Sequence, residues 1–259
     1  MLRSLFRKID PGTVGRRAEL FVGRLGSFET PTVATIVSNY LRGFVLFGRP
    51  NTYGARFTWH WFPARAIITS DTANVPKKLR PYQRRGELEV RYDQDFEAII
   101  NYRQQGRDGW LTPELVEVYI EVQKLGFVAT VGTYRDGRLV GGLWGLEIGR
   151  VFSIMSMFHL ENHAGALALA ALVDIVVHEG RWSIIDCGTL KANWQRYGAR
   201  EIPVQEFSEL VIRSLKSSMS RAGWAATLPE LDGTSRGAES SIMRSKELNE
   251  AEPVSTRLR

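Results

Sequence analysis

The segment 164–180, AGALALAALVDIVVHEG, constrains the fold of this chain most strongly. It has the length and composition of a helix, and it is apolar nearly all round, with Asp174 interrupting the apolar run. A helix of this kind is buried, because it has no polar face to present to water. Its apolar run is also shorter than the roughly 20 residues that a membrane-spanning helix needs. Other parts of the chain must therefore enclose this helix in a core.

Strand patterns flank this helix in the sequence. Residues 127–159 contain three apolar runs, and turn signals at 136–137 and 148–150 divide them into two hairpins. Residues 182–187, WSIIDC, predict a buried strand after the helix. Two further helices are expected upstream, over 93–106 and 112–126. This order is that of an acyltransferase-type α+β domain, whose mixed sheet splits around a V-shaped opening.

The remaining segments divide the chain into three parts. The spacing of apolar residues over 32–44 predicts a helix, and residues 57–69 predict a strand with a kink at Pro63. From about Ser217 the chain is rich in Ser, Gly, Ala and Glu, a composition typical of disorder. The predicted parts are a small N-terminal α/β domain over 1–70, a second domain over 71–216 and a disordered tail over 217–259.

Composition excludes several classes of protein. The 259 residues are 44% hydrophobic and 24% charged, which are globular averages and exclude collagen-like or wholly disordered chains. Cys187 is the only cysteine, so a disulfide scaffold and a cysteine-cluster zinc site are excluded. His159 and His163 are four residues apart without an evident third ligand, so we expect no metal. The basic N-terminus lacks the apolar core of a signal peptide, and we expect a cytoplasmic protein.

Several short motifs follow the order and spacing of one known family. The most specific are RLVGGLWG (138–145) and YGAREIP (197–203). The others are YLRGF (40–44), WHWFPARA (59–66), DGWLT (108–112), SMFH (156–159) and IIDC (184–187). Over roughly residues 30–210 the sequence resembles the bacterial leucyl/phenylalanyl-tRNA–protein transferases.

This resemblance implies a fold and an activity. The family has a small N-terminal domain and a C-terminal domain with an acetyltransferase-like (GNAT-type) fold. Its members transfer Leu, Phe or Met from aminoacyl-tRNA to the N-terminal amine of proteins that begin with Arg or Lys, which marks those proteins for degradation. The implied partners are aminoacyl-tRNA and such proteins, with no cofactor, no metal and no membrane. We expect a monomer.

Asp186 is the candidate catalytic residue. It ends the apolar strand SIIDC, where an unpaired carboxylate is costly, and it matches an Asp of the family. An α-amine has a pKa of roughly 7.7–8.0 and is partly neutral at cellular pH, so little base strength is needed. The reaction then depends on positioning and on stabilisation of the oxyanion. Asp186 would orient the amine; alternatively, it caps the next helix or pairs with an Arg.

The sequence also departs from the family pattern. Gly188 stands where the family has a Gln, and Ile154-Met155 stand where it has Gly-Glu. Gly165-Ala166 replace Ser-Lys, and Trp59-His60 replace paired tryptophans. These polar and aromatic positions changed while the apolar frame stayed. An altered but active transferase and a catalytically decayed paralogue that still binds charged tRNA or N-terminal Arg/Lys proteins both fit this pattern.

The resemblance places an apolar pocket for the transferred amino acid. The residues at the corresponding positions are all apolar: Leu143, Met155, Leu169, Leu172 and Ile185. A socket of this kind suits Leu, Phe or Met, and it selects by size. Ordinary core packing explains the same residues equally well.

Two tryptophans match family positions that contact the tRNA 3′ end. These are Trp59 and Trp110. A nucleobase stacked on an aromatic face gains roughly 1–3 kcal/mol, and RNA ends are often recognised in this way. A buried structural role is the alternative for each.

A basic stretch precedes the second domain's strands. It contains Lys77, Lys78, Arg80, Arg84 and Arg85. The family position and the nearby aromatic residues favour contacts with tRNA phosphates. A solvated charged segment is the alternative, and we expect Pro81 to break or kink a helix here.

An acyl-CoA N-acetyltransferase on the same fold is a third, weaker hypothesis. That class carries a pyrophosphate loop of the form Q/R-x-x-G-x-G/A before its central helix. The corresponding stretch here, ENHAGALA (161–168), has one Gly in place but lacks the basic or amide residue and the final small pair.

Overall fold

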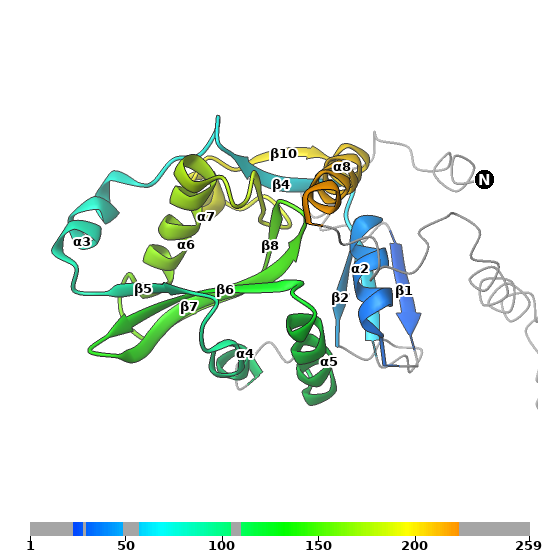
Figure 1. Cartoon of the computed structure of the whole chain (residues 1–259), viewed down its shortest axis with the longest axis horizontal. Coiled ribbons are helices and arrows are strands. Elements are labelled where there is room, and N and C mark those ends of the chain that lie inside the picture. The colour runs from blue at the N-terminus through cyan, green and yellow to red at the C-terminus, as the bar shows by residue number, and fades with distance from the viewer. Residues whose placement is uncertain (1–22, 28–29, 49–56, 105–109, 223–259) are drawn as a thin grey trace, which may run out of the picture. The chain divides into compact units, whose positions relative to one another are not determined.

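The computed structural model describes residues 23–27, 30–48, 57–104 and 110–222 (Figure 1). Within these ranges the chain forms two β-sheets, one of three strands and one of seven, with helices packed against both. The first residues of the chain and most of the predicted tail lie outside the described part.

The seven-stranded sheet is mixed. Its strands lie in the order β10 (Arg200–Pro203), β4 (Ala64–Thr69), β9 (Ile184–Asp186), β8 (Val151–His159), β7 (Arg138–Ile148), β6 (Val128–Arg135) and β5 (Glu89–Tyr92). All neighbours are antiparallel except β8 and β9, which are parallel. The predicted α+β class with a mixed sheet is confirmed.

The sheet splits between β8 and β9. The two strands pair only over 151–153 and 184–186, so Ser153 and Asp186 form the last pair. Beyond this point β8 continues to His159 with β7 as its paired neighbour. The predicted V-shaped opening therefore begins at the Ser153–Asp186 pair.

The hairpins formed where the turn signals placed them. Asp136 and Gly137 both have positive φ, 51° and 76°, as the two-residue turn between β6 and β7 requires. β7 and β8 are joined through Gly149, also at positive φ. The sequence pattern did not predict a β-bulge in β8. Met155 is the extra residue there, because Gly145 pairs with Ile154 and Trp144 with Ser156. Such a β-bulge bends the strand locally.

The predicted buried helix is α6 (Ala164–Asp174), and most of its residues are buried. It covers one face of strands β5–β8, while α4 (Phe96–Gln104) and α5 (Pro113–Lys124) cover the other (Figure 1). After Asp174 the chain continues in the wider π-helical turn η3, Ile175–Glu179, where the sequence predicted an unbroken α-helix to Gly180.

Against α6 lies the basic segment, which forms the short turn η2 (Lys77–Leu79) and helix α3 (Arg80–Arg85). The Gln83 side chain donates a hydrogen bond to Asp174 of α6 at 3.1 Å. The break expected at Pro81 falls where η2 ends and α3 begins, and Pro81 lies in the first turn of α3. There its missing N–H would have had no helical partner.

The three-stranded sheet belongs to the N-terminal segment. Its order is β1 (Gly23–Ser27), β3 (Phe57–Trp61) and β2 (Phe44–Phe47), and α2 (Val33–Leu41) contacts β2. The sequence predicted a single kinked strand over 57–69, and the structure corrects this. The chain leaves β3 after Trp61, passes Pro63 and enters β4 in the other sheet. Pro63 interrupts pairing because it has no N–H to donate.

At the C-terminal end of the described part lie α7 (Ala192–Gln195) and the long helix α8 (Val204–Ala222). Helix α8 runs six residues past the boundary predicted at 216, so this start of the tail is helical. Residues 223–259 of the predicted tail lie outside the described residues. The domain boundaries stay a prediction.

Helix α5 offers a test of the local folding signals. Thr112 and Pro113 predict its start, and the Thr112 hydroxyl accepts a hydrogen bond from the Leu115 N–H at 3.4 Å. Loss of an N-cap costs about 1 kcal/mol. We therefore expect Thr112→Ala to lower the free energy of unfolding in urea by about 1 kcal/mol. Thr112→Ser keeps the cap and is the control; equal stability of the two variants would contradict the assignment.

Candidate functional site

The vertex of the sheet split is built around the carboxylate of Asp186. This side chain has no exposed surface. It accepts hydrogen bonds from Tyr40 Oη (3.1 Å), from Ser153 Oγ (2.6 Å) and from the Gly188 N–H (2.9 Å). It also accepts from Arg65 through Nε (3.1 Å) and through Nη2, which forms an ion pair with Oδ2. Of the alternatives for Asp186, the pairing with an Arg is the one that the structure contains.

Arg65 is itself buried, with 1% of its surface exposed. Its guanidinium lies over the ring of Phe207 in α8, at 4.7 Å from the centroid, and within 5.8 Å of the Tyr40 ring. Burial alone would lower the pKa of Arg65. The Asp186 carboxylate outweighs burial, so the pKa of Arg65 is raised above its ordinary value. The Arg65 guanidinium therefore keeps its positive charge.

Tyr40 supplies a donor from the N-terminal segment. It lies in α2, and its hydroxyl reaches Asp186 across 146 positions of sequence. Burial, and then the negative charge of Asp186, raise the pKa of Tyr40 well above its ordinary value. Its hydroxyl thus keeps its proton and donates to the carboxylate at every physiological pH.

Sequence reasoning missed Arg65, Tyr40 and Ser153 as partners of Asp186. One signal was present: Arg65 lies in the apolar strand ARAIIT, where a guanidinium is costly unless a carboxylate meets it. A buried Arg and a buried Asp in two short apolar strands predict an ion pair. No local pattern pointed to Tyr40 or Ser153, because their partner is distant in sequence.

The predicted pocket residues lie mostly in the core beside α6. Leu143, Leu169, Leu172 and Ile185 are at most 1% exposed and belong to one apolar cluster. Met155 is the bulged residue of β8 and is half-buried. Since Ile185 faces α6 and neighbouring strand residues alternate, Asp186 faces the opposite side of the sheet. The structure therefore does not bring the pocket residues and Asp186 to one surface, and their binding role stays a prediction.

Gly188 follows the strand end at a left-handed backbone angle, with φ of +74°. A Cβ added there would meet no atom within 4 Å. Its carbonyl accepts from the Ala66 N–H at 2.7 Å, and the Cys187 N–H donates to the Ala66 carbonyl at 2.8 Å. The position that holds Gln in the family is thus open to a side chain, in a backbone conformation that favours Gly.

The two candidate tryptophans are both buried: 4% of the surface of Trp59 and 9% of that of Trp110 are exposed. Trp110 stacks on Trp144 at 6.4 Å and contacts Phe47 of β2 edge-on at 5.8 Å. Phe47 also contacts His60, which alternates with Trp59 along β3. Trp59 therefore faces the other side of the small sheet from Trp110. The structure favours the buried structural alternative and does not form one stacking platform from both.

All five candidate basic residues are exposed on η2 and α3. Arg80 and Arg84 are one helical turn apart and border a cleft of about 450 Å³, which His178 and Asp174 also line. Arg85 lies near Glu87, at 3.8 Å. The border of the cleft thus includes two arginines one helical turn apart, residues suited to binding phosphate oxygens.

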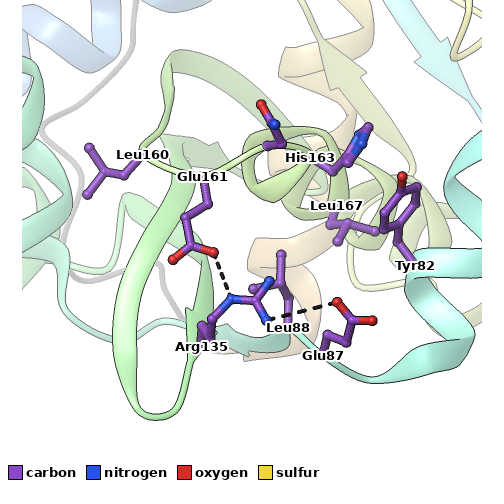
Figure 2. Close-up of a pocket in the computed structure, with 9 residues that line it drawn as sticks. Tyr82, Glu87, Leu88, Arg135, Leu160, Glu161, His163 and Leu167 are labelled. Atoms are coloured by element: carbon purple, nitrogen blue, oxygen red, sulfur yellow. Dashed lines mark hydrogen bonds and ion pairs between the residues drawn. The ribbon is translucent and has the colours of Figure 1, made fainter.

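A second cleft, of about 570 Å³, lies on the other side of α3 (Figure 2). Figure 2 shows Arg135 between two carboxylates: it bonds Glu161 at 2.7 Å and lies 3.9 Å from Glu87. Tyr82 and His163 contact each other ring to ring at 4.1 Å. The charges of this cleft are largely paired with one another, so α3 carries its accessible positive charge on the side of Arg80 and Arg84.

No cluster of three or more His, Cys, Asp or Glu residues in the described ranges is arranged to hold a metal ion. No helix there is long and apolar enough to cross a membrane.

The site yields a stability test with a matched pair of serines in β8. Ser153 donates to Asp186, whereas the buried Ser156 hydroxyl has no hydrogen-bond partner among the described residues. A hydrogen bond to a charged group contributes about 1.5–3 kcal/mol. We expect Ser153→Ala to lower the free energy of unfolding by about that amount and Ser156→Ala to leave it nearly unchanged. Urea unfolding decides this, and equal losses in the two variants would refute the network.

Comparison with known proteins connects this geometry to a family. A family model described as "Leucyl/phenylalanyl-tRNA protein transferase" matches residues 67–212. A leucyl/phenylalanyl-tRNA–protein transferase of Dechloromonas aromatica is 30% identical over 195 residues, which cover 73% of this chain and 82% of the relative. One of Rubrobacter xylanophilus is 32% identical over 186 residues, covering 71% and 95%. The chain belongs to the leucyl/phenylalanyl-tRNA–protein transferase family, as its motifs predict.

The solved structures that match this chain are distant from it. A fungal GCN5-related glucosamine N-acetyltransferase region has a TM-score of 0.38 and 11% identity, covering 69% of this chain and 23% of that chain. A probable N-acyltransferase of Enterococcus faecalis has a TM-score of 0.36 and 12% identity, covering 70% and 43%.

Proposed function

We propose that this protein transfers Leu, Phe or Met from aminoacyl-tRNA to the N-terminal amine of proteins that begin with Arg or Lys. Its membership of the transferase family, over most of the chain, carries this proposal. The split sheet with a fixed vertex supports it, because β8 beyond Ser153 has one edge without a β9 partner. An extended substrate can align its ester along such an edge.

The reaction needs positioning more than strong acid or base catalysis. The neutral amine attacks the carbonyl carbon of the ester, an amide bond forms and the bond to the ribose oxygen breaks. The amine loses one proton and the ribose oxygen gains one. Because the ester is already activated, correct placement of the two reactants supplies the largest share of the acceleration, up to about 7–11 kcal/mol.

In this proposal Asp186 serves the reaction from the vertex of the split. It is close to the strand edge, and its carboxylate orders the backbone at Gly188. The apolar residues named above form the socket for the transferred side chain, and Ile154 and Met157 of β8 pack against this cluster.

A second candidate function is binding without turnover. The replacement of the family Gln by Gly188 favours it, because a side chain that could share the amine's proton is absent. The chain would then hold charged tRNA or proteins with N-terminal Arg or Lys.

A transfer assay read by mass distinguishes the two functions. We expect a gain of one Leu, Phe or Met residue on peptides that begin with Arg or Lys, and none on the matched peptide that begins with Ala. Competition among differently charged tRNAs should favour a bulky apolar amino acid, and a preference for a polar one would contradict the socket. No transfer, with charged tRNA still bound, would establish the binding function.

The variant Gly188→Gln sharpens this assay. The side chain enters open space, at a backbone cost of about 1–2 kcal/mol for the left-handed conformation. If Gly188 limits turnover, the variant gains activity over the wild type. A folded variant with unchanged or lower activity would show that the position does not limit transfer.

Contacts between α3 and the tRNA backbone predict a salt-dependent affinity. We expect Arg84→Glu to weaken tRNA binding and to reduce the slope of log affinity against log salt by about 1. Lys124→Glu is the control, because Lys124 is also exposed, lies on α5, and its replacement changes the net charge by the same amount. Filter binding at several salt concentrations measures both. Identical slopes for the two variants would place the tRNA elsewhere.

A further inference from the structure

We propose that Arg65 and Tyr40 are positioning residues of the transfer reaction, which hold Asp186 so that it orders the backbone at the opening of the sheet. Helix α2 of the N-terminal segment is then part of the active centre. The inference rests on the proposed transfer function and assigns the residues that prepare its site.

The acceptor positions of the Asp186 carboxylate are all occupied. Two oxygens offer about four lone-pair positions. Five hydrogen bonds reach them, from Tyr40, Ser153, the Gly188 N–H and twice from Arg65. The carboxylate has no exposed surface and no acceptor position left for a substrate amine. In this state Asp186 acts on the reaction only through the groups it holds.

Asp186 in turn holds the backbone of Gly188. Asp186 Oδ1 accepts from the Gly188 N–H, two residues further along the chain. The Gly188 carbonyl and the Cys187 N–H bond to Ala66, next to Arg65 on β4. The ion pair and these backbone bonds together fix residues 186–188 between β4 and the opening. This short segment is one wall of the split, and β8 after Ser153 is the other.

Tyr40 contributes to the position of Asp186 separately from Arg65. Arg65 neutralises the charge of Asp186, so Tyr40 is not needed for charge balance. Its hydroxyl instead fixes the direction of Oδ2 from α2, which also contacts α8 and α5. The ring of Tyr40 packs edge-on against Phe207 at 5.9 Å, which holds the hydroxyl in place. The N-terminal segment thereby reaches the vertex through the Tyr40 hydroxyl and through the Gly43 carbonyl, which accepts a hydrogen bond from Arg65 Nη1 at 3.5 Å.

Two variants and one matched control test the inference. Tyr40→Phe removes the hydroxyl and keeps the ring. Arg65→Lys keeps the charge, but a single ammonium cannot reproduce the two donor atoms of the guanidinium. Tyr119→Phe is the control, because Tyr119 is also buried and its hydroxyl has no hydrogen-bond partner among the described residues.

Steady-state transfer kinetics are the first readout. We expect Tyr40→Phe to lower kcat about tenfold, with KM for charged tRNA and peptide unchanged, because loss of a charge-assisted hydrogen bond misplaces the wall and not the bound tRNA. Arg65→Lys should lower kcat further. Tyr119→Phe should match the wild type in both constants. Wild-type kcat in Tyr40→Phe would overturn the proposal, as would a fall in kcat fully accounted for by the unfolded fraction.

Amide hydrogen exchange is the second readout, and it does not need turnover. In Tyr40→Phe the amides of residues 187–189 should exchange faster than in wild type, whereas those of α5 should not change. Unchanged protection at Gly188 would refute the positioning role even if kcat falls. If the wild type transfers no amino acid, the transfer function has failed, and the exchange result still decides whether Tyr40 orders this wall.

Discussion

The Arg65–Asp186 ion pair is the interaction on which the rest of the site depends. Both groups are removed from water, and a lone buried charge of either sign would be costly, so each requires the other. The pair joins β4 to β9 at the point where β9 parts from β8. The ion pair therefore sets the position at which the sheet opens, whereas the apolar core beside α6 stabilises the sheet as a whole.

The two faces of the large sheet differ in the side chains that cover them. On the α6 face the packing is apolar and continuous, and four of the residues proposed for amino-acid binding are part of it. On the other face lie the polar vertex and an aromatic cluster in which Trp144 contacts Phe96, Tyr119 and Trp110. The Asp186 vertex and the residues proposed for amino-acid binding therefore lie on opposite faces of the sheet.

Much of the fold was predictable from the sequence. Period and turn signals placed α6, the hairpins and the start of α5, because these depend on neighbours along the chain. The site was less predictable. Tyr40, Ser153 and Asp186 meet through the fold, and no local pattern encodes a contact over 146 positions. The face on which Trp59 lies depends in the same way on the sheet that β3 joins, and the sequence does not indicate which of the two sheets that is.

The contact between Tyr40 and Asp186 also has a consequence for the order of assembly. Its large sequence separation makes it a contact of high loop-closure cost, formed after the local hairpins. On the ribosome, Tyr40 and Arg65 emerge long before the carboxylate that they bind. The guanidinium remains in solvent until β9 is synthesised, and the opening of the sheet is completed only when Asp186 has met Arg65 and Tyr40.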